Sequence, residues 1–377
     1  PSSTPSARST RVRGWRRVPV DPDALGEFAR ATQPVIEQLV VSRRPGDDDA
    51  AFARALYLCR RTIERRLREV DLPCYIASFS HTTIVYKGLF VSPQLPRFYL
   101  DLTNPLYETQ LAVFHQRYST NTFPSWWLAQ PFRLLAHNGE INTLQGNVNW
   151  TRAREAMLRT SAWGDRWRDL VPLLQDGGSD SAHLDNVLEL LVASGRDALH
   201  ALMMLVPQAW EEMVDLDPAL RAFYEYHACL TEPWDGPAAL AFSDGRVVGA
   251  ALDRNGLRPA RYVITGDGLV LLASEAGVLD LDPARIVEKG RLGPGEMLAV
   301  DTTAGLVLKD GAVKTRAAAR APYERWTRDL IRVPAHSPED VQGVSPEQLH
   351  RLQRIFGYTA EDVQHILRPM AAEGKDP

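Results

Sequence analysis

Residues 114–150 read FHQRYSTNTFPSWWLAQPFRLLAHNGEINTLQGNVNW. Two apolar runs border or lie within this stretch, at 111–114 and 132–136, and each is followed by polar residues. Short apolar runs that end in polar residues are typical of buried strands. The first run leads to Arg117, and the second leads to Asn138 and Gly139. The sequence therefore predicts two strands that present a guanidinium and an Asn-Gly pair at a sheet edge.

Arg117 and the Asn138-Gly139 pair are residue types that suit an amino-acid ligand. A guanidinium pairs with a carboxylate through two parallel hydrogen bonds. An Asn amide beside the backbone N–H of Gly, with no Cβ to hinder approach, can stabilise a developing oxyanion. An Asn-Gly pair is also typical of a hairpin turn, and taken alone it favours that interpretation.

Composition limits the class of protein. The chain has 377 residues, 45% of them hydrophobic and 24% charged, which is typical of a soluble globular protein with one large domain or two ordinary ones. A net charge of −4 does not indicate a nucleic-acid partner. Because no apolar run has the length of a membrane span and the N-terminus has no signal core, we expect a cytoplasmic protein without membrane contact. No glycine-rich nucleotide-binding motif occurs.

The cysteine pattern does not predict a metal site. Cys59, Cys74 and Cys229 form no CxxC pair and no ligand cluster, so neither zinc nor an iron–sulfur centre is predicted within these residues. We expect all three cysteines to be reduced and to lie in or near the core. Cys74, at the start of a predicted strand, is expected to be a buried structural thiol.

The first third of the chain predicts a short disordered segment followed by helix and sheet. Residues 1–13 are rich in Ser, Pro and Arg and are predicted to be disordered. Apolar residues between 52 and 67 fall on one helical face. A strand is expected at 35–41. Further strands, which would form a first sheet with the two of the opening stretch, are predicted at 73–79, 82–87 and 97–102.

The rest of the chain predicts helices followed by a second sheet. Helices are expected at 150–159, 184–192, 198–206 and 220–230, and strands at 238–242, 247–252, 262–264 and 269–273. Two sheets with helices outside them define a layered α+β domain. Residues 301–377 are richer in charge, Pro and Ser and predict a connector that contains two short helices, at 346–356 and 359–370.

Asp180 follows Gly177-Gly178-Ser179 at the start of a predicted helix. A carboxylate at this position is as easily a capping or turn residue as a ligand-binding residue. The residues themselves leave these two roles open.

Several long blocks carry a resemblance to a known family. Residues 114–150 resemble the glutaminase (class II amidotransferase) domain of the large subunit of glutamate synthase, and so do the blocks GGSDSAHLDNVLELL, FYEYHACLTEPWDGPAAL, LDRNGLRPARY and VEKGRLGPGEM. The resemblance begins near Gly14. It implies the four-layer αββα sandwich of the N-terminal nucleophile hydrolases, incomplete at its N-terminus. It also implies a partial amidotransferase domain over 14–300 and, over 301–377, a connector and the start of the lead to a central domain.

The resemblance also implies a reaction. In that family an N-terminal Cys attacks the side-chain amide of L-glutamine, and the ammonia released passes to a flavin domain for reductive formation of glutamate from 2-oxoglutarate. FMN and an iron–sulfur cluster are implied for the full-length enzyme, with none of them in this chain. The implied partners are the remaining domains of the large subunit and a small electron-donating subunit.

Site residues follow from the resemblance position by position. Arg117 is expected to bind the α-carboxylate of glutamine, with support from Thr120. Asn138 and Gly139 are expected to donate to the oxyanion. Asp180 is expected to accept from the α-ammonium, a role that only the resemblance assigns.

This sequence departs from the family pattern at the nucleophile. The family nucleophile is an N-terminal Cys followed by Gly, whereas this sequence begins Pro1-Ser2-Ser3. We therefore expect the isolated chain to lack glutaminase activity, since loss of a nucleophile leaves binding and oxyanion donation only. We also expect exposed strand edges and poor solubility of the isolated chain. The alternative is a catalytically inactive amidotransferase-like module kept for binding or assembly.

Overall fold

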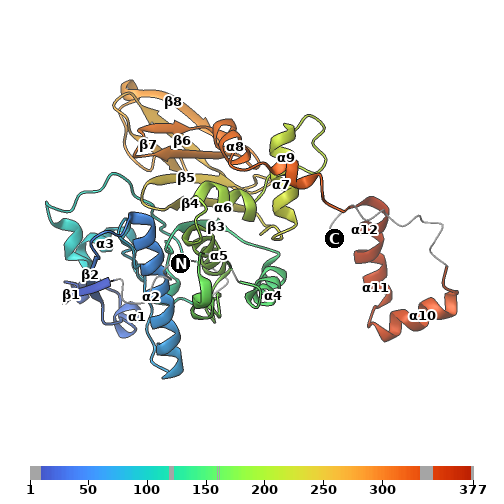
Figure 1. The fold of residues 1–377 in the computed structure, drawn as a ribbon, viewed down its shortest axis with the longest axis horizontal. Helices are drawn as coiled ribbons and strands as arrows, with labels where there is room; N and C mark the ends of the chain where they lie inside the picture. The colour runs from blue at the N-terminus through green and yellow to red at the C-terminus, as the bar shows by residue number, and fades with distance from the viewer. Residues whose placement is uncertain (1–9, 119–122, 159, 161, 332–342, 375–377) are drawn as a thin grey trace. The chain divides into compact units, whose positions relative to one another are not determined.

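The computed structural model describes residues 10–118, 123–158, 160, 162–331 and 343–374 (Figure 1). The chain divides into two compact units, Pro1–Arg328 and Asp329–Pro377. Residues 301–328, which were expected to belong to the connector, lie in the first unit. The reason is that helix α8 (Asp310–Ala318) buries Val313 and Ala317 in the main core. No helix in the described part combines the length and the apolar character that crossing a bilayer requires.

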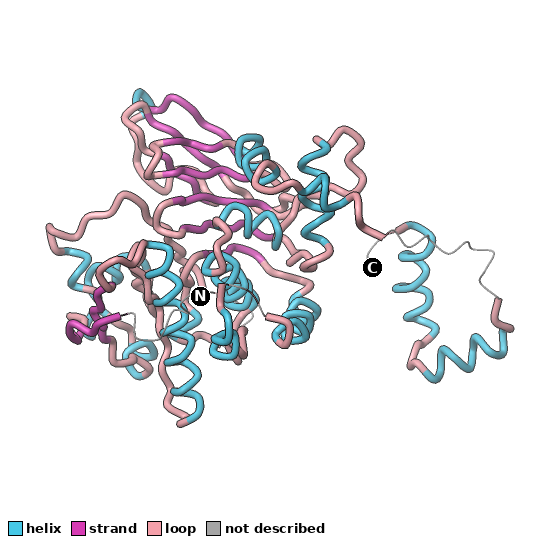
Figure 2. Tube along the Cα trace, viewed as in Figure 1, coloured by secondary structure: helices cyan, strands magenta, loops and turns pink. Residues whose placement is uncertain are grey.

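The first unit is built on a five-stranded antiparallel sheet with strand order β10-β9-β5-β4-β3. Strands are magenta and helices cyan in Figure 2. Its strands are β3 (Leu135–Gly139), β4 (Ala238–Ser243), β5 (Val247–Leu252), β9 (Met297–Asp301) and β10 (Leu306–Leu308). Asn138 and Gly139 are the last two residues of β3, so the hairpin-turn interpretation of this pair is wrong. Among the described residues, β3 is an edge strand of this sheet.

A second antiparallel sheet packs on one face of the first. Its order is β7-β6-β8, formed by β7 (Val270–Ala273), β6 (Arg261–Thr265) and β8 (Ile286–Arg291). Leu252 and Leu298 of the first sheet lie in one apolar cluster with Tyr262 and Leu272 of the second. The α+β class is confirmed, but the predicted grouping of the strands is wrong. The strands expected at 238–242 and 247–252 join β3 in the five-stranded sheet because β4 pairs with β3, and only the strands expected at 262–264 and 269–273 lie in the second sheet.

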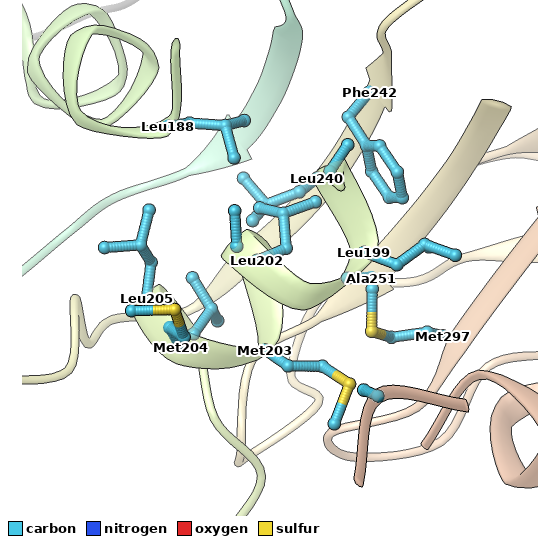
Figure 3. Packing of buried hydrophobic residues seen from close by; sticks show 14 of the residues in the cluster. Leu188, Leu199, Leu202, Met203, Met204, Leu205, Leu240, Phe242, Ala251 and Met297 are labelled. Atoms are coloured by element: carbon cyan, nitrogen blue, oxygen red, sulfur yellow. The ribbon is translucent and has the colours of Figure 1, made fainter. Parts of the chain in front are cut away.

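Three helices cover the other face of the five-stranded sheet. They are α5 (Asp180–Ala193), α6 (Ala198–Leu205) and α7 (Pro218–Ala228). Leu188 of α5 and Leu202 of α6 pack against Leu240 and Phe242 of β4 (Figure 3). Each of these side chains is at least 99% buried, and full burial of one such residue is worth roughly 1.5–3 kcal/mol. This interface is the main core of the unit.

Residues 10–69 include a two-stranded antiparallel sheet and a long helix. Strand β1 (Thr10–Arg17) pairs with β2 (Glu37–Arg43), so residues 10–13 are ordered, contrary to the predicted disorder. Pairing gives their backbone groups the hydrogen bonds that composition could not reveal. Helix α2 (Asp49–Glu69) confirms the predicted helix at 52–67.

The remaining elements of the first unit are short helices. They are η1 (Pro22–Ala24), α1 (Glu27–Ala31), η2 (Ser92–Gln94), α3 (Leu95–Phe98), η3 (Leu100–Thr103), η4 (Trp126–Leu128), α4 (Leu144–Glu155), η5 (Gly164–Leu170), η6 (Pro283–Arg285) and α9 (Tyr323–Thr327).

Four predicted strands are wrong. Residues 73–79, 82–87 and 111–114 form no strand, and 97–102 runs through α3 and η3. An apolar sequence pattern does not determine whether a second strand is available for backbone hydrogen bonding. Two of these segments are instead joined by a side-chain hydrogen bond, in which the Tyr99 hydroxyl donates to the Lys87 carbonyl oxygen at 2.7 Å. Burial still alternates residue by residue over 111–116, which is the period of an extended chain.

The second unit contains α10 (Pro346–Ile355), α11 (Ala360–Asp362), a π-helical turn η8 (Val363–Leu367) and α12 (Arg368–Glu373). The two helices predicted for this segment are thus confirmed, the second as a run of three joined elements. None of the described residues in these elements is buried.

Candidate functional site

The outer edge of β3 carries the backbone N–H of Gly139. Ala238 lies opposite Gly139 in the ladder, but its N–H donates to Asp253 Oδ1 and its carbonyl accepts from the Asp253 N–H, both at 3.0 Å. Because bonded and non-bonded pairs alternate in an antiparallel ladder, the polar backbone groups of Gly139 point away from β4. The Gly139 N–H has no hydrogen-bond partner among the described residues. It is therefore a free donor at the sheet edge.

A close backbone crossing holds this end of β3. Gly139 has φ +133°, and a Cβ there would lie 1.8 Å from the Pro237 carbonyl oxygen. Gly236 has φ +154°, and its Cβ would lie 2.0 Å from the Glu140 carbonyl oxygen. Only glycine fits at either position. Sequence reasoning selected Gly139 and missed Gly236, although Gly236 lies in one of the blocks that carry the family resemblance.

Asn138 precedes Gly139 and is half-buried. It pairs with Ala239, which packs towards the second sheet, so the Asn138 side chain leaves β3 on that face. Its side-chain amide makes no hydrogen bond with a described residue. The amide N–H groups of Asn138 are thus available beside the free N–H of Gly139.

Asp180 lies at the end of β3, although it is distant in sequence. It is the first residue of α5, whose N-cap is Ser179. Its Oδ2 atom accepts from the Ile141 N–H at 3.0 Å, and its Oδ1 atom accepts from the Ser181 N–H at 2.7 Å. Asp180 Oδ2 is also 4.0 Å from Nδ1 of the buried His137. The carboxylate is therefore fixed next to the residues that follow Gly139, and the helix N-terminus favours its negative charge.

Arg117 is the least constrained of the predicted site residues. Its side chain is exposed and makes no hydrogen bond or ion pair with a described residue, Asn138 and Asp180 included. Burial lowers the pKa of His115, two residues before Arg117, and an interaction with the His137 backbone opposes that shift, so this segment lies beside β3. Thr120 lies outside the described residues. The structure thus places Asp180 against Ile141, two residues beyond the Asn138-Gly139 pair, and leaves Arg117 without contact to a described residue of this group.

A buried carboxylate that sequence reasoning missed positions the start of β3. Asp185 of α5 is 0% exposed and accepts from the backbone N–H groups of Arg133, Leu134 and Leu135 at 3.2, 2.8 and 3.2 Å. Burial, and then the charge of Glu189, raise the pKa of Asp185 to about 6. No local sequence signal identifies this role, because the donors lie about fifty residues away along the chain.

None of the three cysteines has the features of an activated nucleophile. All three are free thiols; Cys59 is half-buried, and Cys74 and Cys229 are exposed. The expected burial of Cys74 at a strand start is wrong, because its segment forms no strand. Burial raises the pKa of the Cys59 and Cys74 thiols, which disfavours the nucleophilic thiolate.

The described residues also contain no group of three or more His, Cys, Asp or Glu side chains that could hold a metal ion.

Residues 3–326 match the family described as glutamine amidotransferases class-II, and the chain belongs to this family. Over nearly its whole length the chain is also similar to large chains of glutamate synthase.

Three of these relatives illustrate the similarity. Ferredoxin-dependent glutamate synthase 2 of Synechocystis sp. is 49% identical over 371 residues. The glutamate synthase [NADPH] large chain is 45% identical over 372 residues in Azospirillum brasilense and 43% identical over 367 in Bacillus subtilis. Each alignment covers 97% of this chain and 24% of the relative, so the chain spans about a quarter of the length of these proteins.

Proposed function

We propose that these residues form the glutaminase portion of a glutamate synthase. In this proposal they bind L-glutamine and, with the remaining domains of a longer protein, release ammonia for reductive formation of glutamate from 2-oxoglutarate. The observation that carries the proposal is that the Asp180 carboxylate accepts from the Ile141 N–H, two residues beyond the donors of Asn138 and Gly139. Identities of 43–49% with glutamate synthases support the assignment to this branch of the family.

The geometry suits the two ends of glutamine. The Gly139 N–H and the Asn138 amide lie together and would donate to the oxygen of the side-chain amide as it gains negative charge. Asp180 would accept from the α-ammonium. Each of its oxygens already accepts one backbone N–H, and an ionised carboxylate has about four acceptor positions, so capacity remains.

Arg117, supported by Thr120, would bind the α-carboxylate in this proposal. No carboxylate of a described residue competes for its guanidinium. A bidentate pair with the ligand would therefore form without first breaking an ion pair with one of them.

We also propose that the complete domain is the four-layer αββα sandwich of the N-terminal nucleophile hydrolases. The described residues supply one helical layer and two sheets. Large apolar side chains are exposed, including Phe114 at 62%, Phe123 at 79% and, on the second sheet, Val287 at 68%. Apolar surface of this kind is expected where further structure packs in a larger assembly.

These 377 residues alone are proposed to be inactive in glutamine hydrolysis. The family reaction needs a thiolate nucleophile with a neighbouring base, and the environment of Cys59 and Cys74 disfavours a thiolate. The partners we propose are the remaining domains of the large subunit and a small electron-donating subunit, and the proposed location is the cytoplasm.

Calorimetric titration of the chain with L-glutamine tests the proposal. We expect binding of L-glutamine and weaker binding of D-glutamine. Asp180→Asn should weaken the binding of L-glutamine about 10- to 100-fold, because a hydrogen bond to a charged group is worth about 1.5–3 kcal/mol. Arg117→Lys should weaken it less, by loss of the bidentate geometry. Arg44→Lys, at an exposed position on another surface, is the matched control.

Two results would contradict the proposal. Absence of any L-glutamine binding would reject the binding function and favour an assembly module. Steady release of ammonia from glutamine by the purified chain would reject the proposed inactivity.

A further inference from the structure

The Gln130 side chain lies at the outer edge of β3, where it bonds His137, the residue before the donor pair. Its Oε1 atom accepts from the His137 N–H at 2.6 Å, and its Nε2 atom donates to the His137 carbonyl at 3.1 Å. One side-chain amide thereby makes both hydrogen bonds that a residue of a neighbouring strand would make. The next outward-facing residue is Gly139, whose N–H has no partner among the described residues.

The segment that carries Gln130 is itself held on both sides. The Lys87 ammonium donates to the Trp127 carbonyl at 2.7 Å, and the Phe132 N–H donates to the Leu135 carbonyl at 2.8 Å. Lys87 is 7% exposed and Phe132 is 3% exposed, so both anchors are buried. Gln130 therefore projects from a fixed segment, and its amide can restrain β3.

The bond to the His137 carbonyl acts directly on Asn138. This carbonyl and the Asn138 N–H belong to the same planar peptide group. Holding the oxygen with Nε2 of Gln130 on one side, while β4 pairs with Asn138 on the other, leaves the peptide group little freedom to rotate. The directions of the Asn138 side chain and of the following Gly139 N–H depend on that rotation.

We propose that Gln130 is a positioning residue for the Asn138-Gly139 donor pair, and that it sets how strongly the site prefers a ligand with a side-chain amide. The inference rests on the proposed function. Gln130 touches no ligand in this proposal and acts through the His137 peptide groups. A residue that merely protected the sheet edge would affect stability without changing the preference among ligands.

Two ligands that differ only at the side-chain end separate these roles. L-glutamine and L-norvaline share the α-ammonium and α-carboxylate, but norvaline has no amide. The ratio of their dissociation constants therefore reports on the donor pair. We expect the unsubstituted chain to prefer glutamine, Gln130→Glu to reduce that preference about tenfold, and both variants to bind norvaline equally well.

Gln130→Glu is the sharpest variant because it has the same shape. It keeps the acceptor for the His137 N–H and loses the donor to the His137 carbonyl. Gln130→Leu loses both bonds and should reduce the preference further. Gln145→Glu, at a glutamine on α4 that bonds Asn149 at 3.1 Å, is the matched control. An unchanged ratio of the glutamine and norvaline dissociation constants in Gln130→Glu would overturn the inference. If Gln130→Leu does not fold, Gln130→Glu alone provides the test.

Amide hydrogen exchange supplies a second measurement that needs no ligand. We expect Gln130→Glu to accelerate exchange at the Asn138 N–H at least severalfold, while exchange in the buried helix α6 stays as in the unsubstituted chain. If the unsubstituted chain binds neither ligand, the proposed function fails and exchange alone decides the inference. Equal protection of Asn138 in both proteins would then overturn it.

Discussion

A Cβ atom built on Gly139 would lie 1.8 Å from the carbonyl oxygen of Pro237. The segment before β4 therefore passes directly against the end of β3, and the Glu140 N–H donates to the same Pro237 oxygen at 3.2 Å. This crossing restricts the backbone at the proposed oxyanion donor from one side, while Gln130 restricts it from the other. The donor N–H is thus held by backbone packing.

Gly139→Ala should strongly destabilise the chain. The added methyl meets backbone atoms, and φ +133° is unfavourable for alanine, so we expect a loss of about 2–4 kcal/mol in the free energy of unfolding. Gly268→Ala is the control, because φ is also positive there (+93°) but no atom lies within 4 Å of the added Cβ. Its loss should be about 1 kcal/mol. Urea unfolding measures both values, and equal losses would contradict the steric account.

Asp185→Ala should also destabilise the chain, by about 2–5 kcal/mol, because three backbone N–H groups at the start of β3 would lose their shared acceptor. Asp280→Ala, at an exposed aspartate, should change stability by less than about 0.5 kcal/mol. Thermal unfolding of the two variants provides the comparison. A small effect of Asp185→Ala would show that water replaces the carboxylate.

Stability should fall in acid because of two buried histidines. His200 of α6 and His227 of α7 have their Nε2 atoms 2.9 Å apart, and the His227 Nδ1–H donates to the Phe223 carbonyl at 2.7 Å. Burial lowers the pKa of His200 to about 3, with further lowering by His227, Arg196 and Arg320. Burial lowers the pKa of His227 to about 4.

The sign of this pH effect follows from proton uptake. Below the unfolded pKa of about 6.5 the unfolded chain binds protons that the folded pair refuses, so stability is lost as pH falls from about 6.5 towards 4. Urea unfolding at pH 7.5 and pH 5 should show the loss, and His200→Gln should reduce it. His350→Gln, at an exposed histidine of α10, should leave the loss unchanged. An equal pH dependence in His200→Gln would refute the assignment.

Lys87 should make stability rise with pH as well, in this case at alkaline pH. Its Nζ lies 4.5 Å from the Tyr75 ring centre and 4.9 Å from that of Phe132, and burial, then the charge of Arg133, lower its pKa to about 7. The unfolded chain therefore holds a proton that the folded chain lacks between about pH 7 and 10.4. Stability should rise with pH in this window by up to about 1.4 kcal/mol per unit.

Two lysine variants test the Lys87 prediction through the change of their stability with pH. We expect the rise in the free energy of unfolding between pH 7.5 and 9.5 to be smaller in Lys87→Met than in the unsubstituted chain. Lys289→Met, at an exposed lysine on β8, should keep the rise. If both variants keep it, Lys87 is not the group responsible.

The agreement between sequence and structure follows the range of the interactions. Helix α5 begins at Asp180, which was expected at the start of a helix, because its N-cap Ser179 accepts from a backbone N–H only three residues away. Strands β4 and β5 match their predicted spans because the tight turn at Asp244-Gly245 joins them. The strands expected at 73–79 and 82–87 had the right composition but no described partner, so they did not form.

The residues of the candidate site show the same difference between local and long-range interactions. Gly139 and Asn138 were identified from residue chemistry at one position in the chain. Gln130, Asp185 and Gly236 were missed, because each acts through a segment brought near by folding. Arg60 and Arg61 of α2 were missed for the same reason: both are buried, Arg60 pairs with Glu189 of α5, and Arg61 donates to the Leu170 carbonyl at 2.9 Å.

The sequence by itself determined the family, most helices, the spans of several strands and the residue types able to bind an amino acid. These features depend on local periodicity, capping and long blocks of residues. Only the tertiary structure decided that Asp180 meets the end of β3, that Gly139 turns its N–H outward and that Gln130 pairs with His137. Such contacts depend on the packing of distant segments and on strand partners, neither of which any single stretch of residues contains.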